Sequence, residues 1–178
     1  MSDALSVNDF FAKASKLGFT RLYNFKVLSI DGFPAVNLDP KDYMLYVEAA
    51  SIPTRQVKTA TVPYKAFEFS VPTVVTYPDN NTWKISFFSD NKQLIRSLFE
   101  NWQTALYDPN TYSTSNVDFG KGSVTLQLID DQGKQAKQYI LKGAYPTQIN
   151  TVNYAVTDSG QTVAKVPVTF TYQYFETL

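Results

Sequence analysis

The 178-residue chain contains no cysteine and no histidine. Without cysteine it can form neither a disulfide nor a thiolate metal site. Without histidine it lacks the commonest general base and the commonest metal ligand, so Ser-His-Asp and Cys-His catalysis and histidine-bound zinc are excluded. These two absences argue against an enzyme, and we expect no metal and no cofactor.

The chain also has no excess charge of either sign. Sixteen basic residues balance sixteen acidic ones, whereas a protein that binds duplex DNA normally carries a basic face. No segment approaches the roughly 20 apolar residues of a membrane helix. The N-terminal sequence MSDALSVNDFFAKASKLGF has neither the basic start nor the apolar run of a signal peptide. We therefore expect synthesis in the cytoplasm and no membrane anchor.

Apolar and aromatic residues, in contrast, are abundant. Hydrophobic residues make up 44% of the chain, with 13 Phe, 12 Tyr and 2 Trp, enough for one globular domain spanning residues 1–178. Aromatic side chains that alternate along strands are typical of a core or an interface. The alternative is a platform that stacks on bases or sugars, but no strand has the basic-aromatic pattern of an RNA-binding sheet.

A short helix is predicted over residues 7–17. Ser6 and Asp9 have the spacing of a capping box, and Gly18 is a natural stop. Apolar residues recur at helical spacing between them: Phe10, Phe11, Ala14 and Leu17.

Most of the remaining chain has the alternating pattern of β-strands. About eight strands and two helices are expected, and the clearest strands are 22–30, 42–50, 56–62, 83–87, 123–129, 136–142, 148–157 and 164–175. In the last strand Val166, Val168, Phe170, Tyr172 and Tyr174 are predicted to share one side. Residues 52–78 contain several prolines, so we expect an irregular extended excursion with exposed edges rather than central strands.

One long amphipathic helix follows the strand at residues 83–87. Asp90 is the expected N-cap, and Asp108-Pro109 the expected end. An apolar stripe should cover a β-core, and comprises Leu94, Ile95, Leu98, Phe99, Trp102 and Leu106. The other side carries Lys92, Arg96, Glu100 and Gln103. A polar loop over residues 107–122 comes next.

Two short motifs suggest chemistry, and both have a simpler explanation. Gly120-Lys121-Gly122-Ser123 resembles a phosphate-binding loop, but Gly follows the lysine and a strand follows the serine, so a flexible loop is favoured. Asp130-Asp131 could be a carboxylate pair for acid–base catalysis or a cation-binding site. These residues lie in a predicted hairpin turn, where aspartate is favoured for its backbone hydrogen bonds.

Three blocks resemble the tail tube proteins of contractile-tailed bacteriophages. Phe19–Val27 (FTRLYNFKV) is similar to the start of the family's first strand after a short helix. Val47–Ala105 combines AASIPTRQV, PYKAFEFS and WKISFFSD with a helix that closes on Glu-Asn-Trp-Gln. Ile140–Ile149 (ILKGAYPTQI) resembles a strand followed by a Gly–apolar–aromatic–Pro–Thr bend. The ordered set covers most of the chain.

The resemblance implies a mainly β, two-sheet sandwich or barrel-like tube-protein fold with one flanking helix and a short N-terminal helix. Six copies are expected to form a ring, and stacked rings form the hollow inner tube of a contractile tail. Genomic DNA would pass through this tube without sequence-specific binding. The expected partners are other copies and the sheath, baseplate and tail-terminator proteins, in a virion tail assembled in the host cytoplasm.

The resemblance also suggests residue roles. Tyr64, Phe67 and Phe69 would contact an adjacent subunit or ring, whereas Arg96, Glu100 and Gln103 would face the sheath. Trp102 would fix the helix to the sheet. Lumen residues should be polar and alternate along a strand, which leaves two candidate sets: Thr125 and Gln127, or Thr169, Thr171 and Gln173.

Other functions stay open at this point. The near alternatives are the tube subunit of a bacterial contractile injection or secretion system, and a baseplate tube initiator. A carbohydrate-binding β-sandwich is a different class, in which the aromatic side chains would form the platform.

Overall fold

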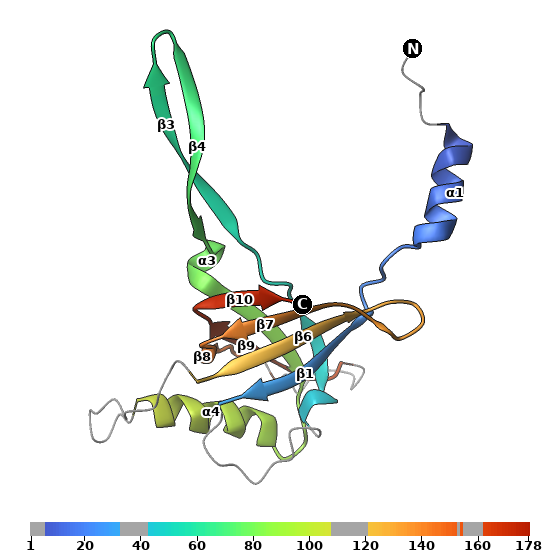
Figure 1. The fold of residues 1–178 in the computed structure, drawn as a ribbon. Coiled ribbons are helices and arrows are strands. Elements are labelled where there is room, and N and C mark those ends of the chain that lie inside the picture. The colour runs from blue at the N-terminus through green and yellow to red at the C-terminus, as the bar shows by residue number, and fades with distance from the viewer. Residues whose placement is uncertain (1–5, 33–42, 108–120, 153, 155–161) are drawn as a thin grey trace.

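A computed structural model describes residues 6–32, 43–107, 121–152, 154 and 162–178. Within these residues the protein is mainly β, with two four-stranded sheets packed over one core and a separate two-stranded hairpin. Figure 1 shows the hairpin and the N-terminal helix extending from the same side of the two sheets, away from the long helix. The prediction of a two-sheet β-sandwich with one flanking helix and a short N-terminal helix is confirmed.

Sheet A is fully antiparallel in the order β1-β6-β7-β10. Its strands are β1 (Phe25–Asp31), β6 (Ser123–Ile129), β7 (Gln135–Lys142) and β10 (Tyr174–Thr177). The turn between β6 and β7 confirms the first predicted hairpin. Val124, Leu126 and Leu141 point into the core, so the intervening residues of β6 form the outer face of the sheet.

Sheet B has the order β2-β5-β9-β8, also antiparallel. Its strands are β2 (Val47–Ala50), β5 (Thr82–Phe88), β8 (Tyr145–Ile149) and β9 (Lys165–Thr171). Trp83, Ile85 and Phe87 of β5 are buried as predicted. The chain passes from sheet A to sheet B at Gly143, whose positive φ of 62° suits glycine.

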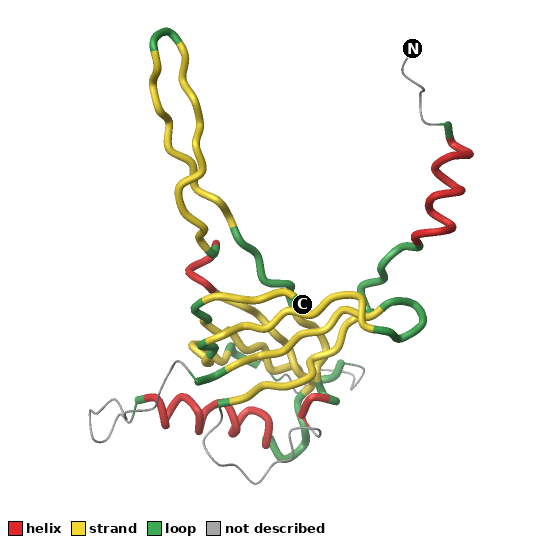
Figure 2. The backbone as a smooth tube through the Cα atoms, viewed as in Figure 1, coloured by secondary structure: helices red, strands yellow, loops and turns green. Residues whose placement is uncertain are grey.

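The long helix α4 (Leu94–Leu106) closes the core at one end of the sandwich (Figures 1 and 2). The ring of Trp102 lies 5.8 Å from Phe170 of β9, and Phe99 packs 5.2 Å from Phe87 of β5. Trp102 also approaches the backbone at Gly32 and Gly122, at the ends of β1 and β6. The predicted packing of the apolar stripe through Trp102 is confirmed, although Leu94 is 45% exposed.

The predicted strand 148–157 is replaced by β8 (Tyr145–Ile149), because residues 150–152 are not in a strand. Three further sequence-based expectations about strands need correction. Residues 43–44 are helical and 45–46 form a turn, because Tyr43 turns into the core and donates a hydrogen bond to the Ile30 carbonyl. The predicted strand 42–50 therefore shrinks to β2. The predicted final strand breaks after Thr171, since Tyr172 and Gln173 bond to Asn81 and Lys142. As a result Tyr174 is exposed, and does not share the buried side of Val166, Val168 and Phe170.

The third correction concerns the proline-rich segment. Residues 56–76 form a regular hairpin of β3 (Gln56–Tyr64) and β4 (Phe67–Thr76), not an irregular excursion. Its exposed edges are as predicted. Pro72 pairs with Thr59 beside a bulge, where the Thr73 hydroxyl donates to the Lys58 carbonyl, and edges and bulges are the positions at which a sheet accepts proline. A single helical turn, α3 (Pro78–Asn81), joins the hairpin to β5.

We expect Trp102→Ala to lower the free energy of unfolding by about 3–5 kcal/mol, because it leaves a cavity where α4 meets both sheets. Asn101→Ala is the matched control: this neighbour is exposed, and its replacement should change stability by less than about 0.5 kcal/mol. Urea unfolding of both variants measures the difference. Equal midpoints for the two variants would show that Trp102 does not support the core.

Candidate functional site

The β3–β4 hairpin has one apolar face and one polar face. Residues opposed in an antiparallel pair share a face, and the register places Val62 opposite Phe69 and Tyr64 opposite Phe67. Ala60 opposite Val71 extends this apolar face. The other face of the same half is formed by Thr59, Thr61, Pro63, Glu68, Ser70 and Pro72. The predicted contact residues Tyr64, Phe67 and Phe69 are therefore brought together on one surface.

No described residue of the chain covers this apolar face. Tyr64, Phe67 and Phe69 are 61%, 69% and 53% exposed, and every residue of β3 is solvent-exposed. A two-stranded hairpin is marginally stable alone and needs more strands or a packed helix. Exposed aromatic side chains gathered on one surface typically mark an interaction site. The apolar face of the hairpin is therefore the candidate interaction surface of the molecule.

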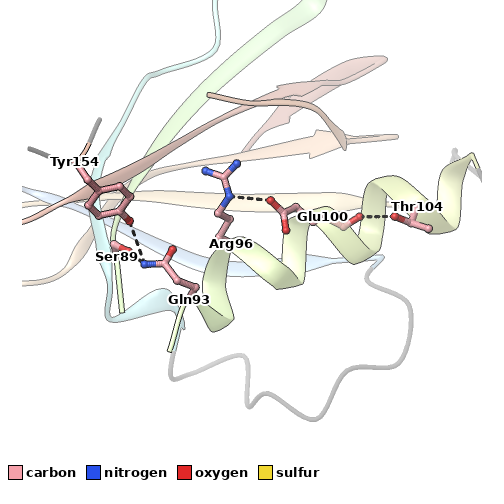
Figure 3. Close-up of polar contacts among 6 residues, drawn as sticks. All are labelled: Ser89, Gln93, Arg96, Glu100, Thr104 and Tyr154. Atoms are coloured by element: carbon pink, nitrogen blue, oxygen red, sulfur yellow. Dashed lines mark hydrogen bonds and ion pairs between the residues drawn. The ribbon is translucent and has the colours of Figure 1, made fainter. Parts of the chain in front are cut away.

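The polar side of α4 faces away from the core (Figure 3). Arg96 donates to Glu100 over 2.7 Å in an exposed i,i+4 ion pair. Gln103 is half-buried, and its amide reaches the Pro146 carbonyl at 3.5 Å. Arg96 and Glu100 therefore present charge at the surface, while Gln103 also ties the helix to β8. Their predicted contact with a sheath stays a prediction.

A polar group near the start of α4 holds the helix to the C-terminal part of the chain. The side-chain amide of Gln93 donates to Ser89 Oγ at 2.9 Å and to the Tyr154 hydroxyl at 3.1 Å (Figure 3). Gln93 has a left-handed backbone, φ 55°, directly before the helix. No sequence pattern pointed to this cluster, because Tyr154 lies 61 residues from Gln93 in sequence.

Asp90 caps α4, although it does not occupy the N-cap position. The helix begins at Leu94, so the N-cap position falls on Gln93 and the expectation for Asp90 needs this correction. The Asp90 carboxylate still accepts hydrogen bonds from the backbone N–H groups of Leu94 and Ile95, at 2.9 and 3.1 Å. Partial burial raises its pKa, but these backbone bonds outweigh that effect and the net pKa is lowered.

The two candidate sets for the lumen lie on different sheets. Thr125 and Gln127 are half-exposed on the outer face of sheet A, and no described helix crosses that face in Figure 1. Thr169 is on the outer face of sheet B but only 8% exposed, and its carbonyl accepts a bond from Thr147. Thr171 is half-buried, and Gln173 is exposed between β9 and β10.

The motifs that suggested chemistry have structural roles. Asp130 Oδ1 accepts from the backbone amides of Gln132 and Lys134, which forms the hairpin turn as expected. Asp131 accepts from the Asn24 side chain. Gly122 leads into β6, and a Cβ there would lie 1.9 Å from the Ala144 carbonyl oxygen, so the glycine serves close backbone packing. Gly120 lies outside the described residues.

Within the described part of the chain, three or more acidic side chains nowhere gather closely enough to hold a metal ion. Over the same residues, the helices are too short or too polar to cross a membrane.

Comparison with known proteins identifies the family. The sequence profile described as phage tail tube protein matches residues 20–178. The chain belongs to the phage tail tube protein family. It is a structural subunit of a tail tube and thus a component of a virion or a related particle. The search of curated protein sequences found no match.

Solved structures share the fold. A chain of an extracellular contractile injection system, in the extended PVC sheath–tube complex, superposes with a TM-score of 0.61 at 14% identity, over 94% of this chain and 96% of that one. The tube-terminating cap of the anti-feeding prophage superposes with a TM-score of 0.62 at 14% identity, over 90% of this chain and 91% of that one. The PVC sheath/tube terminator superposes with a TM-score of 0.59 at 15% identity, over 89% of this chain and 95% of that one.

Sequence reasoning missed part of the hairpin surface. Val62 and Val71 belong to the apolar face with the three predicted aromatic residues. The alternation from Ala60 to Tyr64 carried this information, but the neighbouring prolines made the segment look irregular.

Replacing Asp90 with alanine should lower the free energy of unfolding of the tube subunit by about 1 kcal/mol at neutral pH, the usual effect of a lost helix cap. Because the folded-state pKa is lowered, this contribution is fully present above the ordinary aspartate pKa of about 3.9 and is lost as the pH falls through the folded value. Urea denaturation of the variant and the wild type at pH 7 and at pH 2.5 measures how the difference in their free energies of unfolding depends on pH. A difference between variant and wild type that persists at the lower pH would contradict the role of the carboxylate.

Proposed function

We propose that six copies of this tail tube protein close into a ring, and that stacked rings form the hollow inner tube of a contractile phage tail. The observation that carries the proposal is the exposed apolar face of the β3–β4 hairpin. This surface gathers exposed aromatic side chains, and it stands clear of its own sandwich (Figure 2). An adjacent copy provides the surface that it lacks.

The edges of the two sheets support ring closure. Sheet A ends at β1 and β10, and sheet B at β2 and β8. Open sheet edges invite pairing with other chains, and a closed ring of subunits removes them. Membership of the phage family favours a tail tube over a secretion-system tube, and favours both over a carbohydrate-binding module.

The polar side of α4 is the proposed contact with a surrounding sheath. Arg96 and Glu100 form an ion pair at the surface of α4, with side chains 34% and 49% exposed, and Arg96 lies beside Ile149 at the end of β8. Similar chains occur in structures named as a sheath–tube complex, a sheath/tube terminator and a baseplate, and we extend the corresponding partners to this chain.

The outer face of sheet A is the proposed lumen wall. Thr125 and Gln127 are available on it, whereas Thr169 of the competing set is buried. The register places two basic and two acidic residues on this face, which are Lys26, Lys142, Asp31 and Glu176. Lys142 lies 3.9 Å from Glu176. A polar wall without excess positive charge suits a conduit, because passing DNA would not be held by counterion release.

Changing Phe67 and Phe69 together to serine should prevent tube assembly without unfolding the subunit. Both side chains are exposed in the single chain, so stability should change by less than about 0.5 kcal/mol. Assembly should need at least about tenfold more protein, as expected when interface aromatic residues are lost. Sedimentation and negative-stain microscopy of concentrated protein measure assembly. The matched control, Thr61→Ser with Ser70→Ala, changes the polar face and should assemble normally; tubes formed equally by both variants would refute the hairpin contact.

The lumen assignment can be tested because the chain lacks cysteine. In assembled tubes, Thr125→Cys should react with a small maleimide but not with a maleimide carried on a protein too large to enter the tube. Glu100→Cys, on the outer helix, should react with both. If Thr125→Cys reacts with the large reagent and Thr171→Cys is protected, sheet B lines the lumen instead.

A further inference from the structure

The N-terminal helix α1 (Val7–Leu17) carries a second apolar surface, which no sheet of the described structure covers. Val7, Phe10, Phe11 and Ala14 lie at helical spacing on one side. Phe10 and Phe11 are 57% and 63% exposed. Phe19, 68% exposed, adds a third ring 6.5 Å from Phe10. Figure 1 shows the helix standing clear of both sheets.

Local interactions nevertheless define this helix well. Ser6 Oγ accepts from the Asp9 amide at 3.1 Å, and the Asp9 carboxylate accepts from the Ser6 amide at 3.0 Å. The hydrogen bonds from Ser6 also lower the pKa of Asp9. An isolated helix of 11 residues is marginal in water, and most helices are stabilised by packing of their apolar face. The match to the tube family begins at residue 20, after α1, so the family assignment gives the helix no role.

The apolar face of the β3–β4 hairpin has the matching shape and length. A helix of 11 residues is about 16 Å long. The apolar half of β3, residues 60–64, extends over about 16 Å. An amphipathic helix laid on one face of a sheet forms a two-layer core, and a packed helix is what a lone hairpin requires for stability.

In the folded chain, α1 cannot reach the apolar face of its own β3–β4 hairpin. The hairpin and α1 leave the sandwich at opposite ends of the same side (Figure 1). We propose that the Phe10–Phe11 side of α1 packs on the apolar hairpin face of a second copy. Each chain then provides its α1 to one copy, and its own hairpin face binds the α1 of another copy. This inference rests on the proposed tube assembly, and it names the surface that covers the hairpin.

Cysteine cross-linking tests the contact directly. Chains carrying Phe11→Cys and chains carrying Val62→Cys are mixed at high concentration and oxidised. A disulfide-linked heterodimer is expected, because the two positions come within reach of a disulfide only if α1 meets the apolar hairpin face. The control mixture pairs Lys16→Cys, on the polar side of α1, with Thr61→Cys, on the polar hairpin face. No heterodimer, or equal yields from both mixtures, would overturn the proposal.

A chain that carries both Phe11→Cys and Val62→Cys shows whether the contact joins two copies. Oxidation should give linked multimers. An intramolecular disulfide as the main product would mean that α1 folds back on its own hairpin, which contradicts a contact between copies.

An assembly experiment separates this inference from the proposed function. Phe10→Asp with Phe11→Asp should raise the protein concentration needed for tubes at least about tenfold, with unchanged unfolding of the sandwich. If these tubes form normally while Phe67→Ser with Phe69→Ser abolishes them, the α1 contact is wrong and the tube function stands. If the wild-type chain forms no tube under any condition, the proposed function fails, and the cross-linking result alone decides the contact of α1.

Discussion

The packing of α4 on the two sheets is the interaction on which the rest of the subunit depends. Phe170 lies on the central strand β9 and receives both Phe99 and Trp102, each with ring centroids 5.8 Å away. Trp102 also reaches the ends of β1 and β6 at Gly32 and Gly122. One helix thus contacts both sheets, which otherwise touch through the side chains of their inner faces. The opposite side of the helix is exposed to solvent.

This core uses only part of the apolar sequence. The hairpin and α1 each have a well-defined apolar side, yet neither packs on the sandwich. A single chain can therefore be stable while its most aromatic exposed surfaces lack partners. In the proposed assembly, these surfaces are the ones that become buried between subunits.

The sequence was sufficient where pattern and burial coincide. Trp83, Ile85 and Phe87 alternate on a buried strand, and the Ser6–Asp9 capping box fixed the start of α1. The sequence was insufficient where contacts between residues far apart in the chain change the structure that the local pattern predicts. Tyr43 bends the chain into the core, so β2 is shorter than its alternation suggests. The break at Gln173 depends on bonds to Lys142 and on contact with Gly143, which lie some thirty residues earlier. For the site, alternation located the hairpin aromatics, but nothing local revealed the Gln93–Tyr154 bond.

The prolines of the hairpin have a consequence for the unassembled protein. Pro63 lies in β3 and Pro72 in β4, so each outer edge of the ribbon contains a position without an N–H group. Further strands cannot add in unbroken register along either edge, which hinders growth of amyloid-like fibrils from an exposed and aromatic segment. Unassembled subunits are therefore less prone to edge-to-edge association through this hairpin.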